Sequence, residues 1–195
     1  IEHMIDPSVP ELSPLERLRH SAAHVMAAAI KRLWPEARLA FGPHTEDGFY
    51  YDIDMPHRLA PEDFEKIEAE MQKEVESRHP FVREEISRVE AIGAIPQGAT
   101  LTLYRSGDFV DLCRGPHVRH TGEIRAFKVM SIAGAYWRGD EKRPQLQRVY
   151  GTAFPDRKEL KEYLRLLEEA KARDHRKLGK ELGLFHFDPI APASP

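Results

Sequence analysis

Short segments that favour β-strands, separated by glycine and proline, run through the chain and predict an antiparallel sheet. Gly42-Pro43 and Asp47-Gly48 separate the first two segments, which favours their pairing. The sheet should begin early and draw most of its strands from residues after 80. The segments are 39–41, 48–53, 81–86, 100–104, 109–112, 126–132 and 147–153.

Three helices are predicted to accompany this sheet. Ser13 to Glu16 combine a capping serine, a proline and a glutamate that reaches back, which start a helix ending near Leu33. A third and longer helix should occupy residues 156–182. The second helix opens at residues 61–63, and its buried stripe comprises Phe64, Ile67, Met71 and Val75. The expected fold class is therefore α+β, an antiparallel sheet packed with helices and followed by a long C-terminal helix.

The chain should divide into four parts. Residues 1–12 form an extended lead-in, 13–155 the main domain, 156–182 a linker helix of the same module, and 183–195 a proline-containing tether. Hydrophobic residues make up 41% of the 195 residues, which suits a soluble domain with one sizeable core. The sequence shows neither a membrane-spanning run nor a secretion signal, so we expect a cytoplasmic protein.

Two histidines on the first predicted helix are the first candidate functional residues. His20 and His24 are four residues apart, so their imidazoles project from one helix face. A partly exposed helix face would explain the same spacing, and the pair needs a partner elsewhere in the chain to form a site.

The segment from Asp111 to His117 supplies such a partner. It places a carboxylate, the single cysteine Cys113 and an imidazole where a strand ends in a Gly-Pro turn. Together with His20 and His24 it offers four nitrogen or sulfur donors, a set that suits tetrahedral zinc. The alternative is a metal-free pocket in which the histidines and Asp111 deprotonate water and Cys113 recognises the substrate.

The residues also resemble a known family, the editing (second N-terminal) domain of bacterial-type threonyl-tRNA synthetases. The resemblance covers nearly the whole chain. It rests on six motifs in the same order: HSAAH at 20–24, GFYYD at 48–52, DLCRGPH at 111–117, AGAYWRGD at 133–140, LQRVYGTAF at 146–154 and RDHRKLGKEL at 173–182.

The resemblance implies an enzyme that hydrolyses seryl-tRNA formed by mistake on threonine tRNA. The catalytic set would be His20, His24, Asp111, Cys113 and His117, with Tyr51 lining the substrate pocket. In the related alanyl-tRNA synthetase editing domains, the two-histidine and Cys-His pairs hold zinc. Threonyl editing domains are described as acting without an essential metal, so no cofactor is expected to be required. The module would serve an aminoacylation domain that lies outside this chain.

Such a second site is needed because serine differs from threonine by one methyl group, which a binding site distinguishes by only about 1–3 kcal/mol. One departure from the family concerns a longer segment with a Pro-Tyr-Lys signature, whose lysine faces the pocket. This chain passes directly through residues 88–96 without that signature.

The formal charge of -3 excludes a uniformly basic surface, so any RNA contact must come from a local cluster of cations. One such cluster lies on the third predicted helix. A solvated helix end, with cations near the negative end of the helix dipole, explains the same residues and is the favoured interpretation. Two other functions stay open: a free-standing zinc-dependent editing factor of the alanyl type and a non-catalytic tRNA-binding module. The cluster comprises Lys171, Arg173, Arg176, Lys177 and Lys180.

Overall fold

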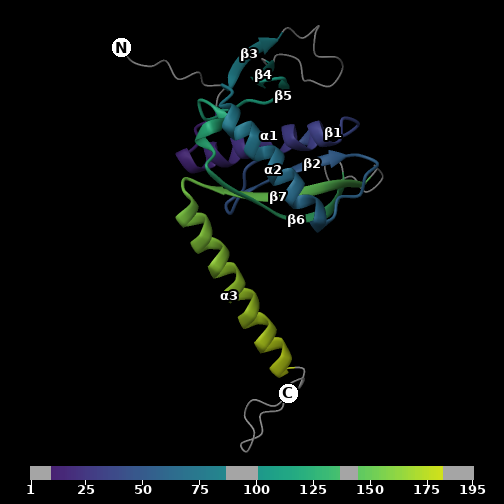
Figure 1. Cartoon of the computed structure of the whole chain (residues 1–195), viewed down its shortest axis with the longest axis vertical. Helices are drawn as coiled ribbons and strands as arrows, with labels where there is room; N and C mark the ends of the chain where they lie inside the picture. The colour runs from purple at the N-terminus through teal and green to yellow at the C-terminus, as the bar shows by residue number, and fades with distance from the viewer. Residues whose placement is uncertain (1–9, 87–100, 137–144, 182–195) are drawn as a thin grey trace, which may run out of the picture. The chain divides into compact units, whose positions relative to one another are not determined.

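The computed structural model describes residues 10–86, 101–136 and 145–181. It contains two antiparallel sheets and three α-helices, and the α+β prediction is confirmed (Figure 1). The chain forms two compact units, residues 1–156 and 157–195. Within the described residues, no helix is long and apolar enough to cross a membrane.

Helix α1 (Pro14–Leu33) begins as the sequence predicts. The Glu16 amide donates to Ser13 Oγ at 3.3 Å, and Glu16 Oε2 accepts from the Ser13 amide at 2.8 Å. This reciprocal pair satisfies amides at the helix start that have no partner within the helix. The helix is buried over most of its length, and many of its buried positions are small: Ala22, Ala23, Ala27, Ala28 and Ala29.

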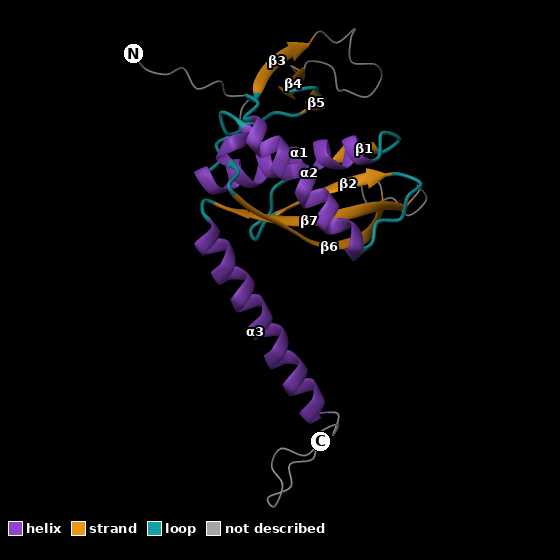
Figure 2. Cartoon of the chain, viewed as in Figure 1, coloured by secondary structure: helices purple, strands orange, loops and turns teal. Residues whose placement is uncertain are grey.

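The larger sheet has the strand order β1-β2-β7-β6. Its strands are β1 (Arg38–Phe41), β2 (Phe49–Asp54), β6 (Ala126–Tyr136) and β7 (Gln145–Phe154). Strand β2 pairs with β1 and with β7, nearly a hundred residues further along the chain. Helix α1 packs on β2 and β7 while α2 contacts β6, so both helices lie across one face of this sheet (Figure 2).

Helix α2 (Phe64–Ser77) follows a 3₁₀ turn, η1 (Pro61–Asp63), and lies against α1. Its predicted stripe is buried at Ile67, Met71 and Val75 and partly buried at Phe64. Arg32 at the end of α1 donates to Glu70 at 3.0 Å and to Glu74 at 2.9 Å. These charged hydrogen bonds join the two helices and neutralise carboxylates that are largely removed from water.

The strands predicted between residues 81 and 112 do not join the larger sheet. They form a separate antiparallel sheet of β3 (Val82–Ile86), β4 (Leu101–Ser106) and β5 (Phe109–Leu112). The expectation of a single sheet was therefore wrong, because strand propensity does not determine which strands pair. The Phe81 amide donates to the Arg119 carbonyl at 3.0 Å, which ties the start of this sheet to the segment that leads into η2 (Thr121–Glu123).

Helix α3 (Arg157–Glu181) forms the described part of the second unit. Its side chains up to residue 176 are mostly exposed, and ion pairs such as Arg165 with Glu162 lie along its surface. The first nine residues of the predicted lead-in (1–12) and the whole of the predicted tether (183–195) lie outside the described residues.

Candidate functional site

His20 and His24 project from the same face of α1, as their spacing predicts. Their ring centroids are 5.1 Å apart with an interplanar angle of 80°. His24 is only 3% exposed, whereas His20 is half-buried. The histidine pair is thus part of the packed interior at one end and reaches solvent at the other.

Cys113 and His117 lie in the loop that follows β5. The Cys113 amide donates to the Thr102 carbonyl at 3.1 Å, and Thr102 Oγ1 donates to the Cys113 carbonyl at 2.6 Å. The chain then turns through Gly115, which has φ 71° and a cis peptide bond to Pro116. A Cβ at Gly115 would lie 2.2 Å from the Tyr104 hydroxyl oxygen, so both backbone conformation and space require glycine there.

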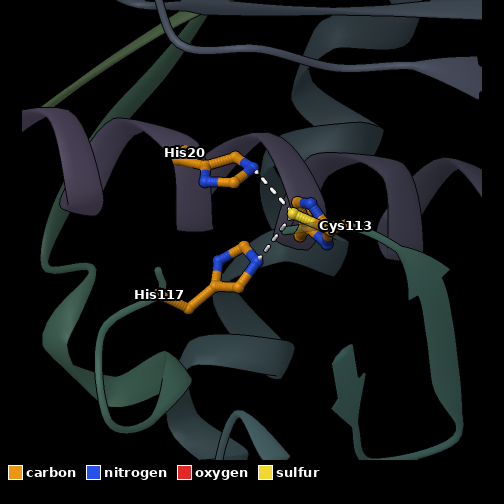
Figure 3. A group of neighbouring side chains, drawn as sticks. His20, Cys113 and His117 are labelled. Atoms are coloured by element: carbon orange, nitrogen blue, oxygen red, sulfur yellow. Dashed lines mark hydrogen bonds between the residues drawn. The ribbon is translucent and has the colours of Figure 1, made fainter. Parts of the chain in front are cut away.

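The two pairs meet in one cluster, and Figure 3 shows three of its members, His20, Cys113 and His117. Cys113 Sγ lies 3.2 Å from His20 Nε2 and 3.5 Å from His117 Nε2. One ligand atom from each of His20, His24, Cys113 and His117 lies within 4.8 Å of the others. Residues separated by almost ninety positions in the sequence therefore present their donors to a common centre.

His117 is held by several side chains of the cluster and its surroundings. Its ring stacks on Phe81 at 4.7 Å with an interplanar angle of 9°, and Tyr104 packs edge-on against it at 4.5 Å. Its Nδ1 lies 3.0 Å from Ser21 Oγ on α1. A stacked ring, an edge-on ring and a contact at one nitrogen together fix the orientation of this imidazole.

Asp111 and Tyr51 complete the cluster on the side of His24. The Tyr51 hydroxyl donates to Asp111 Oδ2 in a short hydrogen bond, and the same oxygen lies 3.6 Å from His24 Nε2. Tyr51 is 1% exposed and its ring packs directly under Gly42, so it is a core residue whose hydroxyl reaches the site. Asp111 is 20% exposed and presents its carboxylate at the boundary with solvent.

Burial dominates the electrostatics of the site. It lowers the pKa of His20 and of His24 to about 3 and holds that of His117 well below its usual range. Neighbouring imidazoles lower the pKa of His20 and His117 further. Burial also raises the pKa of Asp111, and it raises that of the Cys113 thiol to about 12. At neutral pH the site therefore contains three neutral imidazoles and a protonated thiol.

The four donors also have a spacing that suits zinc. Tetrahedral zinc places a bound sulfur and nitrogen roughly 3.5 Å apart, and the two measured Cys113 separations are 3.2 and 3.5 Å. The Gly115 amide donates to Cys113 Sγ at 3.2 Å and would stabilise a metal-bound thiolate. The residues therefore fit the ion, and binding by all four would close its coordination shell.

The cations predicted to contact RNA lie outside this cluster. Lys171, Arg173 and Arg176 are exposed on α3, where Lys171 pairs with Glu168 at 3.3 Å. The side chains of Lys177 and Lys180, and the segment 88–96 that lacks the family lysine, lie outside the described residues. The RNA contact therefore stays a prediction.

Backbone amides in the turn around Gly115 are potential donors to an oxyanion that develops on a substrate carbonyl. The Gly115 amide is engaged by Cys113 Sγ, and the Val118 amide donates to Ser21 Oγ at 3.0 Å. Those two amides are therefore not available in this arrangement. Ser21 itself was missed, because a serine within a helix gives no distinctive sequence signal.

Comparison with known proteins places this geometry in a family. The family model for the threonyl and alanyl tRNA synthetase second additional domain matches residues 101–150, which include Asp111, Cys113 and His117. A threonine–tRNA ligase of Clostridioides difficile is 53% identical over 195 residues, covering 92% of this chain. Nearly the whole chain is therefore similar to part of a threonine–tRNA ligase, and residues 101–150 match the second additional domain.

Relatives from other bacteria agree with this assignment. A threonine–tRNA ligase of Nitratidesulfovibrio vulgaris is 54% identical over 194 residues and 91% of this chain, and one of Dehalococcoides mccartyi is 54% identical over 195 residues and 94% of it. The match covers 30% of the Clostridioides and Nitratidesulfovibrio proteins and 33% of the Dehalococcoides protein. The chain therefore spans about a third of the length of these ligases.

Proposed function

We propose that this domain hydrolyses the ester bond of seryl-tRNA formed on threonine tRNA, as the editing module of a threonyl-tRNA synthetase. The observation that carries the proposal is the meeting of the α1 histidines with the Cys113–His117 pair and the Tyr51–Asp111 pair. Neutral imidazoles, a carboxylate and a thiol within one partly open cluster are suited to deprotonating water next to a small polar amino acid.

The reaction is addition of water to the carbonyl carbon of the ester. An imidazole of the cluster accepts a proton from the water, and the oxygen of the water forms a bond to the carbonyl carbon. The bond between that carbon and the ribose oxygen then breaks, and the ribose oxygen takes up the proton. The products are serine and tRNA with its terminal hydroxyl restored.

Asp111 assists this step electrostatically. Its Oδ2 lies 3.6 Å from His24 Nε2, so an imidazole that gains a proton does so beside a carboxylate. The Tyr51 hydroxyl holds that carboxylate in place. We assign His20, His24 and His117 to water activation and ester positioning. Asp111 stabilises the positive charge that develops on an imidazole when it gains a proton.

Cys113 has a different role in this proposal. Burial raises its pKa to about 12, so at neutral pH it is a thiol and a poor nucleophile. With Asp111 it would contact the amino and hydroxyl groups of serine, while packed residues such as Tyr51 exclude the extra methyl group of threonine. Zinc held by all four donors would organise the cluster, whereas zinc held by three of them would keep a position open and supply Lewis-acid polarisation.

The test is deacylation of seryl-tRNA and threonyl-tRNA, both formed on threonine tRNA, by the purified chain with and without chelator. Wild type should release serine faster than threonine. His24→Ala should reduce the rate by roughly 10²-fold or more if an imidazole transfers the proton. His175→Ala is the matched control, because His175 is exposed on α3, and its rate should equal that of wild type.

Serine release at the buffer rate would reject the hydrolase proposal. Tight tRNA binding without release would instead identify a tRNA-binding module. Loss of activity with chelator, restored by zinc, would show the zinc-dependent chemistry expected of an alanyl-type editing factor. Because the chain spans about a third of the length of the ligases it matches, we propose an aminoacylation domain and threonine tRNA as its partners.

A further inference from the structure

Ser21 is a completely buried polar residue at the centre of the site. It lies on α1 next to His20 and has an exposed fraction of 0%. Its Oγ has three neighbours: the Val118 amide at 3.0 Å, the Arg17 carbonyl at 2.8 Å and His117 Nδ1 at 3.0 Å. Ser21 thus joins the helix that carries two of the histidines to the loop that carries the third.

The direction of each hydrogen bond follows from counting protons. A serine hydroxyl has one proton to donate and two lone pairs to accept with. The Val118 amide can only donate and the Arg17 carbonyl can only accept, so the hydroxyl proton points to Arg17. The second lone pair of Ser21 Oγ then faces His117 Nδ1, which must carry a proton.

The opposite assignment is disfavoured by the geometry. If Ser21 donated to His117 Nδ1, no proton would lie between Ser21 Oγ and the Arg17 carbonyl oxygen. The lone pairs of two oxygen atoms 2.8 Å apart would then face each other at a fully buried position, which is unfavourable. The first assignment instead gives every polar atom of the group a matching partner.

We propose that Ser21 is a positioning residue that fixes His117 as the tautomer with the proton on Nδ1. The other ring nitrogen, Nε2, is left with a free lone pair that faces Cys113 Sγ at 3.5 Å. A hydrogen bond at one imidazole nitrogen determines what the other nitrogen can do. Here Nε2 becomes the atom that accepts the thiol proton, accepts a proton from water or binds a cation.

Stacking on Phe81 reinforces this arrangement. The parallel contact at 4.7 Å keeps the His117 ring in one plane, and Ser21 determines which edge carries the proton. Without the serine, the buried Nδ1 would lose its acceptor. The proton would then move to Nε2, and that nitrogen could no longer accept the thiol proton, accept a proton from water or bind a cation.

The test is the tautomer of His117, measured by ¹H–¹⁵N correlation of the ring nitrogens in the chelator-treated chain. Wild type should show a protonated Nδ1 whose hydrogen exchanges slowly with solvent. Ser21→Ala should lose this preference, and Ser21→Thr, which keeps the hydroxyl, should retain it. Thr152→Val is the matched control: it removes another buried hydroxyl, one that donates to the Asp47 carbonyl, and should leave the His117 signals unchanged.

A wild-type spectrum with the proton on Nε2 would overturn the proposal, and so would an unchanged Nδ1 proton in folded Ser21→Ala. If Ser21→Ala does not fold, the wild-type spectrum alone decides. A second readout rests on the proposed function: Ser21→Ala should lower serine release about 10- to 100-fold, and Ser21→Thr should restore it. The spectrum needs no substrate, so failure of the hydrolase proposal would leave the tautomer result intact.

Discussion

Alkylation of Cys113 with iodoacetamide distinguishes a site built around a neutral thiol from one built around a thiolate paired with an imidazolium. Burial raises the pKa of this thiol from 9.0 to about 12, so at pH 8 the thiolate population falls roughly 10³-fold. A more basic thiolate is intrinsically more reactive, by roughly 16- to 32-fold for a Brønsted coefficient of 0.4–0.5. The net expectation is alkylation roughly 30- to 60-fold slower than that of an ordinary thiol.

The assay is the rate of adduct formation followed by mass spectrometry between pH 7 and pH 11, with chelator present. Cys113 is the single cysteine, so every thiol adduct reports on it, and the same chain in concentrated urea provides the reference rate. Steric shielding would also slow the reaction, but only a raised pKa makes the rate keep climbing above pH 9. A folded rate equal to the urea rate, or one that levels off near pH 8.5, would refute the neutral thiol and favour a cysteine nucleophile.

Three further changes test other parts of the site. Gly115→Ala should destabilise the fold by about 1–2 kcal/mol or more, because its Cβ would overlap the Tyr104 hydroxyl at a positive φ, whereas Gly122→Ala, which meets the flexible side chain of Arg78, should cost less in urea denaturation. Tyr51→Phe should lower the free energy of unfolding by about 1–2 kcal/mol and slow serine release, because Asp111 loses its hydrogen bond. Because the pKa of the two α1 histidines is lowered by folding, the unfolded chain binds more protons than the folded chain below pH 6.5. Stability should therefore fall from that pH towards pH 3, by up to about 1.4 kcal/mol per pH unit for each histidine, and less steeply in a variant with both replaced by asparagine.

Local signals account for the parts of the fold that the sequence predicted well. The capping pair of Ser13 and Glu16 involves atoms three residues apart, so it could be recognised without knowledge of the rest of the chain. The common face of His20 and His24 follows from helical geometry alone. Strand segments were located to within a few residues, because alternation and turn residues are also local properties.

The pairing of segments distant in the sequence was harder to predict than local structure. Nothing in the composition of residues 81–112 distinguishes strands of a separate sheet from strands of the main one, and β2 meets β7 nearly a hundred residues away. The meeting of His20 with Cys113 was expected from the complementary donor types of the two pairs and from the family resemblance rather than from periodicity. Ser21 escaped notice because its importance lies in three partners from two segments, which only coordinates reveal.

The buried alanines of α1 hold this helix, and the two histidines it carries, close to the elements it packs against. Ala22, Ala23, Ala27 and Ala29 are fully buried in a helix that packs on both α2 and the main sheet. A larger side chain at any of them would lift the helix by a fraction of its own width, and a misplacement of about 1 Å can slow an enzyme roughly 10²-fold. Larger residues at these positions should therefore slow the proposed release of serine before they prevent folding.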